Sequence, residues 1–72
     1  MSDEARDLRA LLEAVCEALT VPDGDVYNRR IADRALWARV TIHGALDDDP
    51  SDLGWNTDYL RRKIEAEEAR NK

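Results

Sequence analysis

Apolar residues in the first twenty positions recur at steps of three and four, which at about 100° per residue places them on one side of a helix. Charged residues fall on the opposite side, and Pro22 followed by Asp23 and Gly24 ends the pattern. Ser2 is a suitable N-terminal cap, because its hydroxyl accepts hydrogen bonds from exposed helical amides. We therefore expect an amphipathic helix over about residues 3–20, whose core-facing residues are Leu8, Leu11, Leu12, Val15 and Leu19.

The second helical segment is apolar on two sides. With Asp23 or Asp25 as its cap, it extends over about residues 25–46. Its first strip, which we expect to face the core, consists of Tyr27, Ile31, Ala35, Ala38, Ile42 and Leu46. Its second strip, further round the helix, consists of Leu36, Trp37 and Val40. A helix with two apolar sides is either enclosed by two neighbours or exposes one side to another molecule.

The ends of the second and third helices depend on a glycine and an acidic segment. Gly44 either ends the second helix or lies within it, and the return of the next residues, up to Leu46, to the first strip favours continuation. Residues 47–55 combine like charges with a proline and a glycine, which oppose regular structure. We expect an acidic loop there, within which Pro50 can begin a single helical turn. A third helix follows over about residues 56–70.

These elements predict an all-α fold, a small three-helix bundle made of a helical hairpin and a third C-terminal helix. We expect a single helical domain over residues 1–72, with an open hairpin and a loosely docked third helix as the alternative. A chain of this length buries only about 60% of the surface that its unfolded form exposes. One cysteine and one histidine provide neither an internal disulfide nor a four-ligand zinc site. Stability must therefore come from helix packing or from a partner subunit.

No group of residues matches a catalytic, metal or cofactor motif. Part of the spacing of a calcium-binding loop is followed by Asp47, Asp49, Ser51 and Asp58. The position that requires glycine for its sharp turn is Asp52, however, so we expect a solvated acidic loop. Neither Cys16 nor His43 has a neighbour in sequence that would make a nucleophile and base pair. We therefore expect no enzymatic activity, no metal site and no cofactor.

Charge and hydropathy bear on location and on nucleic acid. The sequence contains no apolar run of the roughly 20 residues that cross a bilayer, and residues 1–4 lack the features of a secretory signal, so we expect a cytoplasmic protein without membrane contact. A net charge of −5 disfavours nonspecific binding to nucleic acid. Basic residues nevertheless gather beside aromatic ones. A small nucleic-acid-binding regulator is therefore the alternative function, and it would use Arg30, Arg34, Arg61, Arg62 and Lys63.

Trp37 is the residue that best indicates a binding surface. Trp and Arg are enriched among the residues that contribute most to protein interfaces, and the first strip of the second helix already suffices for an internal core. Trp37 otherwise covers the core beneath the third helix. We expect a noncatalytic protein that binds another protein, or a second copy of itself, through this region. The partner-binding residues would be Leu36, Trp37 and Val40, with Arg30 and Arg34 at the rim.

Three stretches of the chain have a recognisable order. Residues 8–19 are rich in leucine and alanine, residues 34–40 read Arg-Ala-Leu-Trp-Ala-Arg-Val, and residues 54–64 read Gly-Trp-Asn-Thr-Asp-Tyr-Leu-Arg-Arg-Lys-Ile. Together with the acidic loop they resemble small uncharacterised helical proteins of actinobacteria and their phages. The resemblance covers most of the chain and implies a helical protein encoded by a phage or mobile element. It implies no activity, cofactor or functional motif.

Overall fold

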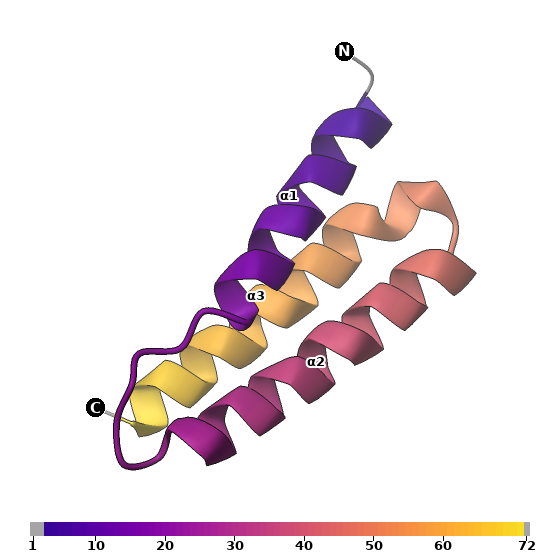
Figure 1. The fold of residues 1–72 in the computed structure, drawn as a ribbon. Coiled ribbons are helices and arrows are strands. Elements are labelled where there is room, and N and C mark those ends of the chain that lie inside the picture. Colours follow the sequence, from indigo (N-terminus) through magenta and orange to yellow (C-terminus); the bar gives the residue numbers. More distant parts are fainter. Residues whose placement is uncertain (1–2, 72) are drawn as a thin grey trace.

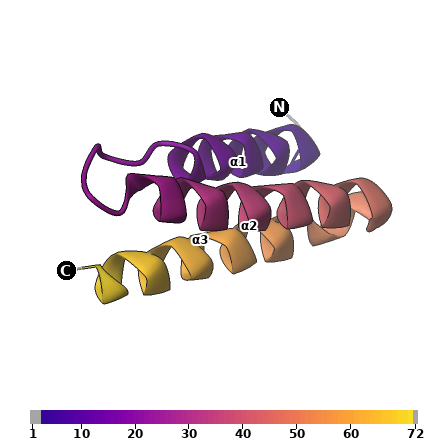
Figure 2. The same cartoon turned by 60° about the horizontal axis from the view of Figure 1, so that its bottom comes forward.

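The computed structural model describes residues 3–71, in which three α-helices pack side by side (Figure 1). They are α1 (Asp3–Ala18), α2 (Tyr27–Asp47) and α3 (Leu53–Arg70), and a short 3-10 helix, Pro50–Asp52, precedes α3. α1 and α3 run in one direction and α2 runs in the other, so the helices alternate up, down and up (Figures 1 and 2). The predicted all-α three-helix bundle is confirmed.

α1 ends at Ala18, slightly before the predicted end near residue 20. The N–H of Leu19 still bonds to the carbonyl of Val15 (3.1 Å), but Thr20 closes the last turn with its hydroxyl, which donates to the carbonyl of Cys16 (2.8 Å). The N–H of Thr20 bonds three residues back, to the carbonyl of Glu17 (3.1 Å), and Pro22, which has no N–H to donate, prevents the helix from continuing. The predicted cap, Ser2, lies outside the described residues.

α2 begins at Tyr27 rather than near residue 25, and neither predicted aspartate caps it. The N–H of Tyr27 instead bonds to the carbonyl of Gly24 (3.1 Å), so a backbone turn leads into the helix. At the other end α2 passes through Gly44 and continues to Asp47, which confirms the predicted continuation. The N–H of Asp48 completes this end by bonding to the Gly44 carbonyl (2.8 Å).

α3 begins at Leu53, so the prediction of an acidic loop over residues 47–55 and a helix from residue 56 was wrong at this boundary. The carboxylate of Asp49 accepts the N–H of Ser51 (3.0 Å), and the N–H of Asp52 bonds to the Asp49 carbonyl (2.8 Å). These two bonds hold the 3-10 turn that the sequence allowed as an alternative. Leu53 follows at once and is buried, which ties the first turn of α3 to the core.

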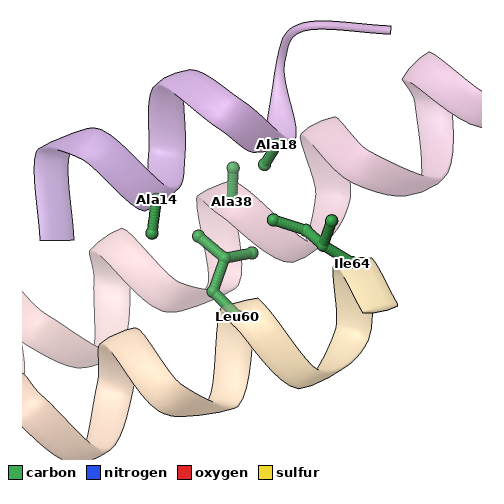
Figure 3. Packing of buried hydrophobic residues seen from close by; sticks show 5 residues of the cluster. All are labelled: Ala14, Ala18, Ala38, Leu60 and Ile64. Carbon is green, nitrogen blue, oxygen red and sulfur yellow. The ribbon is translucent and has the colours of Figure 1, made fainter. Parts of the chain in front are cut away.

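The core is built from small residues of α1 and α2 and larger ones of α3. It consists of Ala14, Ala18, Ala38, Leu60 and Ile64 (Figure 3). The alanines let the helices approach closely, and the two larger side chains of α3 extend among them (Figure 3). α3 packs on α1 and on α2 more extensively than these two pack on each other. α1 and α2 run antiparallel as the predicted helical hairpin, and α3 packs along both of them.

The buried side of α1 lies beside the predicted one. Its buried residues are Leu11, Ala14 and Ala18. Leu8, Leu12 and Leu19, which were predicted to face the core, are 47%, 61% and 48% exposed. The prediction was therefore right for Leu11, which is buried, and for Val15, which packs against the core cluster, but wrong for these three leucines. Ala14 and Ala18 take their place because small side chains allow the helices to approach closely.

The buried side of α2 lies between the two predicted strips. Its buried residues are Arg34, Ala38 and Thr41. Only Ala38 of the first strip is buried, while Ile42 and Leu46 are 39% and 77% exposed. Thr41 tolerates burial because its hydroxyl donates to the carbonyl of Trp37 (2.8 Å). The first strip was therefore wrongly assigned as the core side. α2 exposes apolar side chains on both sides of its buried residues, with Val40 on one side and Ile42 and Leu46 on the other.

Candidate functional site

The second strip of α2 borders α3 and is open to solvent. Leu36 and Val40 are each 48% exposed, and Trp37 is half-buried against the core cluster. Trp37 thus covers the core with part of its ring, as one interpretation of the sequence required, while its neighbours leave apolar surface uncovered. Trp37 and Val40 lie on the side of α2 that borders α3, whereas Leu36 lies further round the helix, in a hollow that it shares with Ala35.

α3 provides the opposite wall with two aromatic rings. Trp55 and Tyr59 are one turn apart, and their rings stack with centroids 6.1 Å apart and an interplanar angle of 16°. Trp55 is 68% exposed, which is unusual for the largest apolar side chain in the protein. A groove runs between the two helices, and we call it the aromatic groove. It is lined by Val40, Thr41, Gly44, Asp48, Trp55, Asn56 and Tyr59.

Gly44 and Asn56 meet at the base of this groove. A Cβ on Gly44 would lie only 2.9 Å from Oδ1 of Asn56, so the close approach of the helices here depends on glycine. The amide of Asn56 donates to Oδ2 of Asp48 (3.3 Å) and to the carbonyl of Asp52 (3.1 Å). A buried, hydrogen-bonded asparagine therefore joins the end of α2 to the start of α3 and fixes the shape of the groove.

A lysine lies at the other end of the aromatic surface. Nζ of Lys63 is 6.0 Å from the ring centroid of Trp37 and 5.7 Å from that of Tyr59, distances at which a cation is attracted to aromatic faces. Next to it is an open hollow of about 400 Å³. The hollow is lined by Trp55, Asp58, Tyr59, Arg62, Lys63 and Ala66. The aromatic groove thus continues into a surface that carries positive charge.

Arg30 and Arg34 are not at the rim of this surface, as was predicted, because both hold a buried carboxylate. Nη2 of Arg30 donates to Oε1 of Glu67 (2.6 Å), and Nε of Arg34 donates to Oε2 of Glu67 (2.9 Å). Arg34 also donates to the carbonyl of Glu17 (3.2 Å) and to Glu68 (3.2 Å). Arg34 is 2% exposed and Glu67 is 1% exposed. These two arginines join the helices and have little surface left for a partner.

The arginines change the acidity of the carboxylate that they enclose. Hydrogen bonds from Arg30, opposed in part by burial, lower the pKa of Glu67 from 4.5 to about 2, and Arg34 adds to this effect. For Arg34, burial opposes the charged form, but the hydrogen bonds and charges of Glu67 and Glu68 outweigh it, so the pKa of Arg34 is raised. Glu67 is thus ionised throughout the physiological range, and the cluster is a fixed ion network with no group ready to exchange protons.

The other three basic residues proposed for nucleic-acid binding are Arg61, which forms a surface ion pair, and Arg62 and Lys63, which line the hollow. Nη1 of Arg61 lies 3.0 Å from Oε2 of Glu17, which joins α3 to α1 at the surface. Of the five residues proposed for nucleic acid, Arg62 and Lys63 line the hollow beside the aromatic rings. The structure therefore does not gather the predicted basic residues on one surface.

Within residues 3–71, no three His, Cys, Asp or Glu side chains are placed to share one metal ion. In the acidic segment, the backbone N–H of Ser51 lowers the pKa of Asp49, so this carboxylate is engaged in holding the turn. The thiol of Cys16 is exposed on α1.

Comparison with known proteins adds no family to this description. No protein-family model, curated protein or solved structure matches the chain. None of the helices within the described residues has both the length and the apolar character needed to span a membrane. Conclusions about function therefore depend on the geometry of the aromatic groove.

Three residues of this surface were not assigned to it from the sequence. Trp55, Tyr59 and Lys63 follow one another at four-residue spacing, which places them on one side of α3. This four-residue spacing is visible in the sequence, but the predicted start of α3 after Trp55 assigned the tryptophan to the acidic loop. Because α3 begins at Leu53, Trp55 lies one turn before Tyr59 on the same side of the helix.

Proposed function

We propose that the protein is a noncatalytic interaction protein that binds a partner protein through the aromatic groove. The observation that carries this proposal is Trp55, a tryptophan that is 68% exposed and stacked on Tyr59 beside the exposed Val40. Large aromatic side chains held in a fixed orientation give extensive contact area at a low cost in conformational entropy. Such residues are the ones that contribute most to binding in protein interfaces.

The chemistry of the groove indicates what kind of segment it would take. Val40, Trp55 and Tyr59 give it apolar and aromatic surface, and polar residues line its base. The adjoining hollow carries Lys63 and Arg62 together with Asp58. We therefore expect a partner segment with two or more apolar side chains followed by an acidic residue that pairs with Lys63. The groove is open and shallow, which suits a peptide segment or helix surface better than a small molecule enclosed on all sides.

Nucleic-acid binding is less well supported by the arrangement of charges. Its electrostatic contribution requires several cations on one surface, whereas Arg30 and Arg34 are engaged by the buried Glu67. The net charge of −5 opposes it further. We retain a cytoplasmic location and a phage or mobile-element origin as expectations that accompany the proposal.

The groove can be tested with a displayed library of random peptides selected against the immobilised protein. We expect enriched peptides to carry apolar residues next to an acidic one and to bind with a Kd of about 10 μM. Trp55→Ser should weaken their binding at least about tenfold, since hot-spot aromatics cost about 2 kcal/mol or more on truncation. Binding is measured by titration calorimetry, with circular dichroism to confirm that each variant remains helical.

Leu46→Ser is the matched control, because Leu46 is also highly exposed on α2 but lies on its other side. Its peptide affinity should equal that of the wild type. The proposal is wrong if the enriched peptides bind the Trp55→Ser variant as tightly as the wild type, or if Leu46→Ser reduces their affinity to the same extent.

A further inference from the structure

A second apolar surface lies on the side of the molecule that the aromatic groove does not use. It consists of exposed side chains of α1 and α2, and we call it the aliphatic face. Its members, with their exposed fractions, are Leu8 (47%), Leu12 (61%), Leu19 (48%), Ile42 (39%) and Leu46 (77%). An exposed aliphatic group of this size on a protein of 72 residues calls for a physical explanation.

The α1 part of this face points away from α3. At about 100° per residue, Leu8, Leu12 and Leu19 fall on the side of α1 opposite Glu17. The carboxylate of Glu17 bonds to Arg61 of α3 at 3.0 Å, so this opposite side is the one turned away from α3.

The α2 part points the same way. Ile42 and Leu46 fall on the side of α2 opposite Trp37 and Gly44, by the same helical geometry. Gly44 approaches Asn56 of α3, and Trp37 lies beneath Lys63 of α3. The exposed apolar sides of α1 and α2 are therefore both turned away from α3, and the two helices also contact each other.

The total surface of the chain shows how much is left uncovered. Its accessible surface is 5214 Å². A compact monomer of its mass, 8.2 kDa, exposes about 4,500 Å², so the chain exposes roughly 700 Å² more than a compact monomer does. A protein interface of standard size covers about 800 Å² on each partner. The surplus is therefore close to one side of such an interface.

We propose that the aliphatic face is a homodimer interface, occupied by a second copy of this chain. A twofold interface brings the same surface of both copies together, so the surface must be complementary to itself. Aliphatic side chains meet this condition without any matching of charges, because their attraction does not depend on sign or direction. The dimer also buries the leucines of α1 that the monomer leaves exposed.

The charges beside the face agree with a second copy. Arg9 and Glu13 are paired at 3.2 Å on the adjoining side of α1, so the edge carries both signs and no net charge. This pair therefore adds no net charge where the two faces would join along this edge of α1. The aromatic groove lies on the other side of α2 and remains open in the dimer, which makes the dimer bivalent for a groove ligand. The dimer itself does not depend on the groove's having a partner.

Sedimentation equilibrium of the purified chain tests the interface. We expect a dimer with a Kd between about 1 and 100 μM, at the weak end of the range that interfaces of this size cover. Leu12→Glu should raise the dimer Kd at least about tenfold, because it places two carboxylates in the apolar contact. Leu12 is 61% exposed in the monomer, so the variant should keep its helical circular dichroism.

Val40→Glu is the matched control, since Val40 is 48% exposed and lines the aromatic groove on the other side of α2, and its dimer Kd should equal that of the wild type. Isotope-filtered nuclear Overhauser spectra of mixed labelled and unlabelled protein identify the contacting methyl groups directly. Contacts from Leu12 or Leu46 across the copies support the proposal. A chain that stays monomeric at about 1 mM overturns it. Dimer contacts made by Val40 would also overturn it, and would place self-association in the groove instead.

Discussion

Glu67 is the residue on which α2 and α3 depend for their alignment. It is almost fully buried, and Arg30 and Arg34 of α2 approach its carboxylate from two sides. Ion pairs of this kind add little to stability relative to well-packed apolar residues, because both charges must lose their water. Removal of one partner lowers the free energy of unfolding strongly, because the charges of the other partners stay buried without an opposite charge beside them. The main effect of the cluster is thus to fix the register of α2 against α3, and its contribution to the stability of the fold is smaller.

The depressed pKa of Glu67 predicts how stability depends on pH. In the unfolded chain the carboxyl titrates near 4.5 and in the folded chain at about 2, so the unfolded state binds more protons between these values. The contribution of Glu67, about 3 kcal/mol, is therefore fully present above about pH 5 and is lost as the pH falls toward 2. Asp49, whose pKa is also lowered, should add a smaller loss in the same direction. Urea denaturation at a series of pH values measures this profile.

Two variants separate Glu67 from the other carboxyls. Glu67→Gln should lower the free energy of unfolding at pH 7 by about 3 to 5 kcal/mol, because it leaves Arg34 buried and unpaired, and its profile should be flatter below pH 5. Glu68→Gln changes a pair whose carboxylate is half exposed, so it should cost under about 1 kcal/mol. An equal acid loss in wild type and Glu67→Gln would contradict the assignment.

At the scale of the helices, the sequence predicted periodicity better than orientation. The two apolar strips of α2 are real, since Val40 projects on one side and Ile42 on the other. Helical spacing shows which residues share a side, but it does not show which side meets a neighbour. The line that became buried contains Arg34 and Thr41, which single-sequence patterns assign to the surface. Their burial depends on Glu67 and on the Trp37 carbonyl, partners that only the fold brings near.

The helix boundaries likewise depend partly on local sequence and partly on contacts that form only in the fold. Gly44 does not interrupt α2, as the apolar residues after it predicted. The start of α3 was misplaced, because the aspartates and Gly54 indicate a loop by composition. Burial of Leu53 and the bonds of Asn56 outweigh that tendency. For the candidate site, the α2 half was predicted from Trp37, while the α3 half required knowing that Trp55 belongs to a helix.

The contact between Gly44 and Asn56 gives a prediction for the junction of α2 and α3. In an open helix, Gly→Ala stabilises by about 1 kcal/mol through helix propensity. Here the new Cβ would lie 2.9 Å from Oδ1 of Asn56 and displace an amide that makes two hydrogen bonds. Those bonds contribute about 1 kcal/mol each, so Gly44→Ala should be neutral or destabilising in the wild type. Urea denaturation of the variant measures the difference.

A double-mutant cycle identifies the cause. In an Asn56→Ala background the obstructing side chain is absent, and Gly44→Ala should then stabilise the protein by about 0.5 to 1 kcal/mol. The control is Gly54→Ala, which meets nothing within 4 Å and should be stabilising in both backgrounds. If Gly44→Ala stabilised the wild type as much as it does the Asn56→Ala variant, the close approach of the two helices would be refuted.

At the scale of the whole molecule, the core is small and the uncovered apolar surface is large. The core cluster contains three alanines and two larger aliphatic residues, and three of the five largest fully buried side chains, Arg34, Glu67 and Thr41, are polar. Such an interior supplies only part of the apolar burial that stabilises a domain of this size. The aromatic groove and the aliphatic face lie on opposite sides of α2, so each can be covered without closing the other. Binding at either surface stabilises the folded chain by mass action.

The net charge of the molecule predicts how salt affects the dimer. Each copy carries −5, so two copies repel each other. Salt shortens the range of the repulsion to about 8 Å at 0.15 M, while the apolar contact is unaffected. The dimer Kd should therefore fall about threefold or more between about 0.02 and 0.3 M NaCl, as measured by sedimentation equilibrium. Sodium sulfate at equal ionic strength should strengthen the dimer further, because it favours apolar burial. A Kd that rises with salt would mean that charged pairs, rather than the leucines of α1, hold the two copies together.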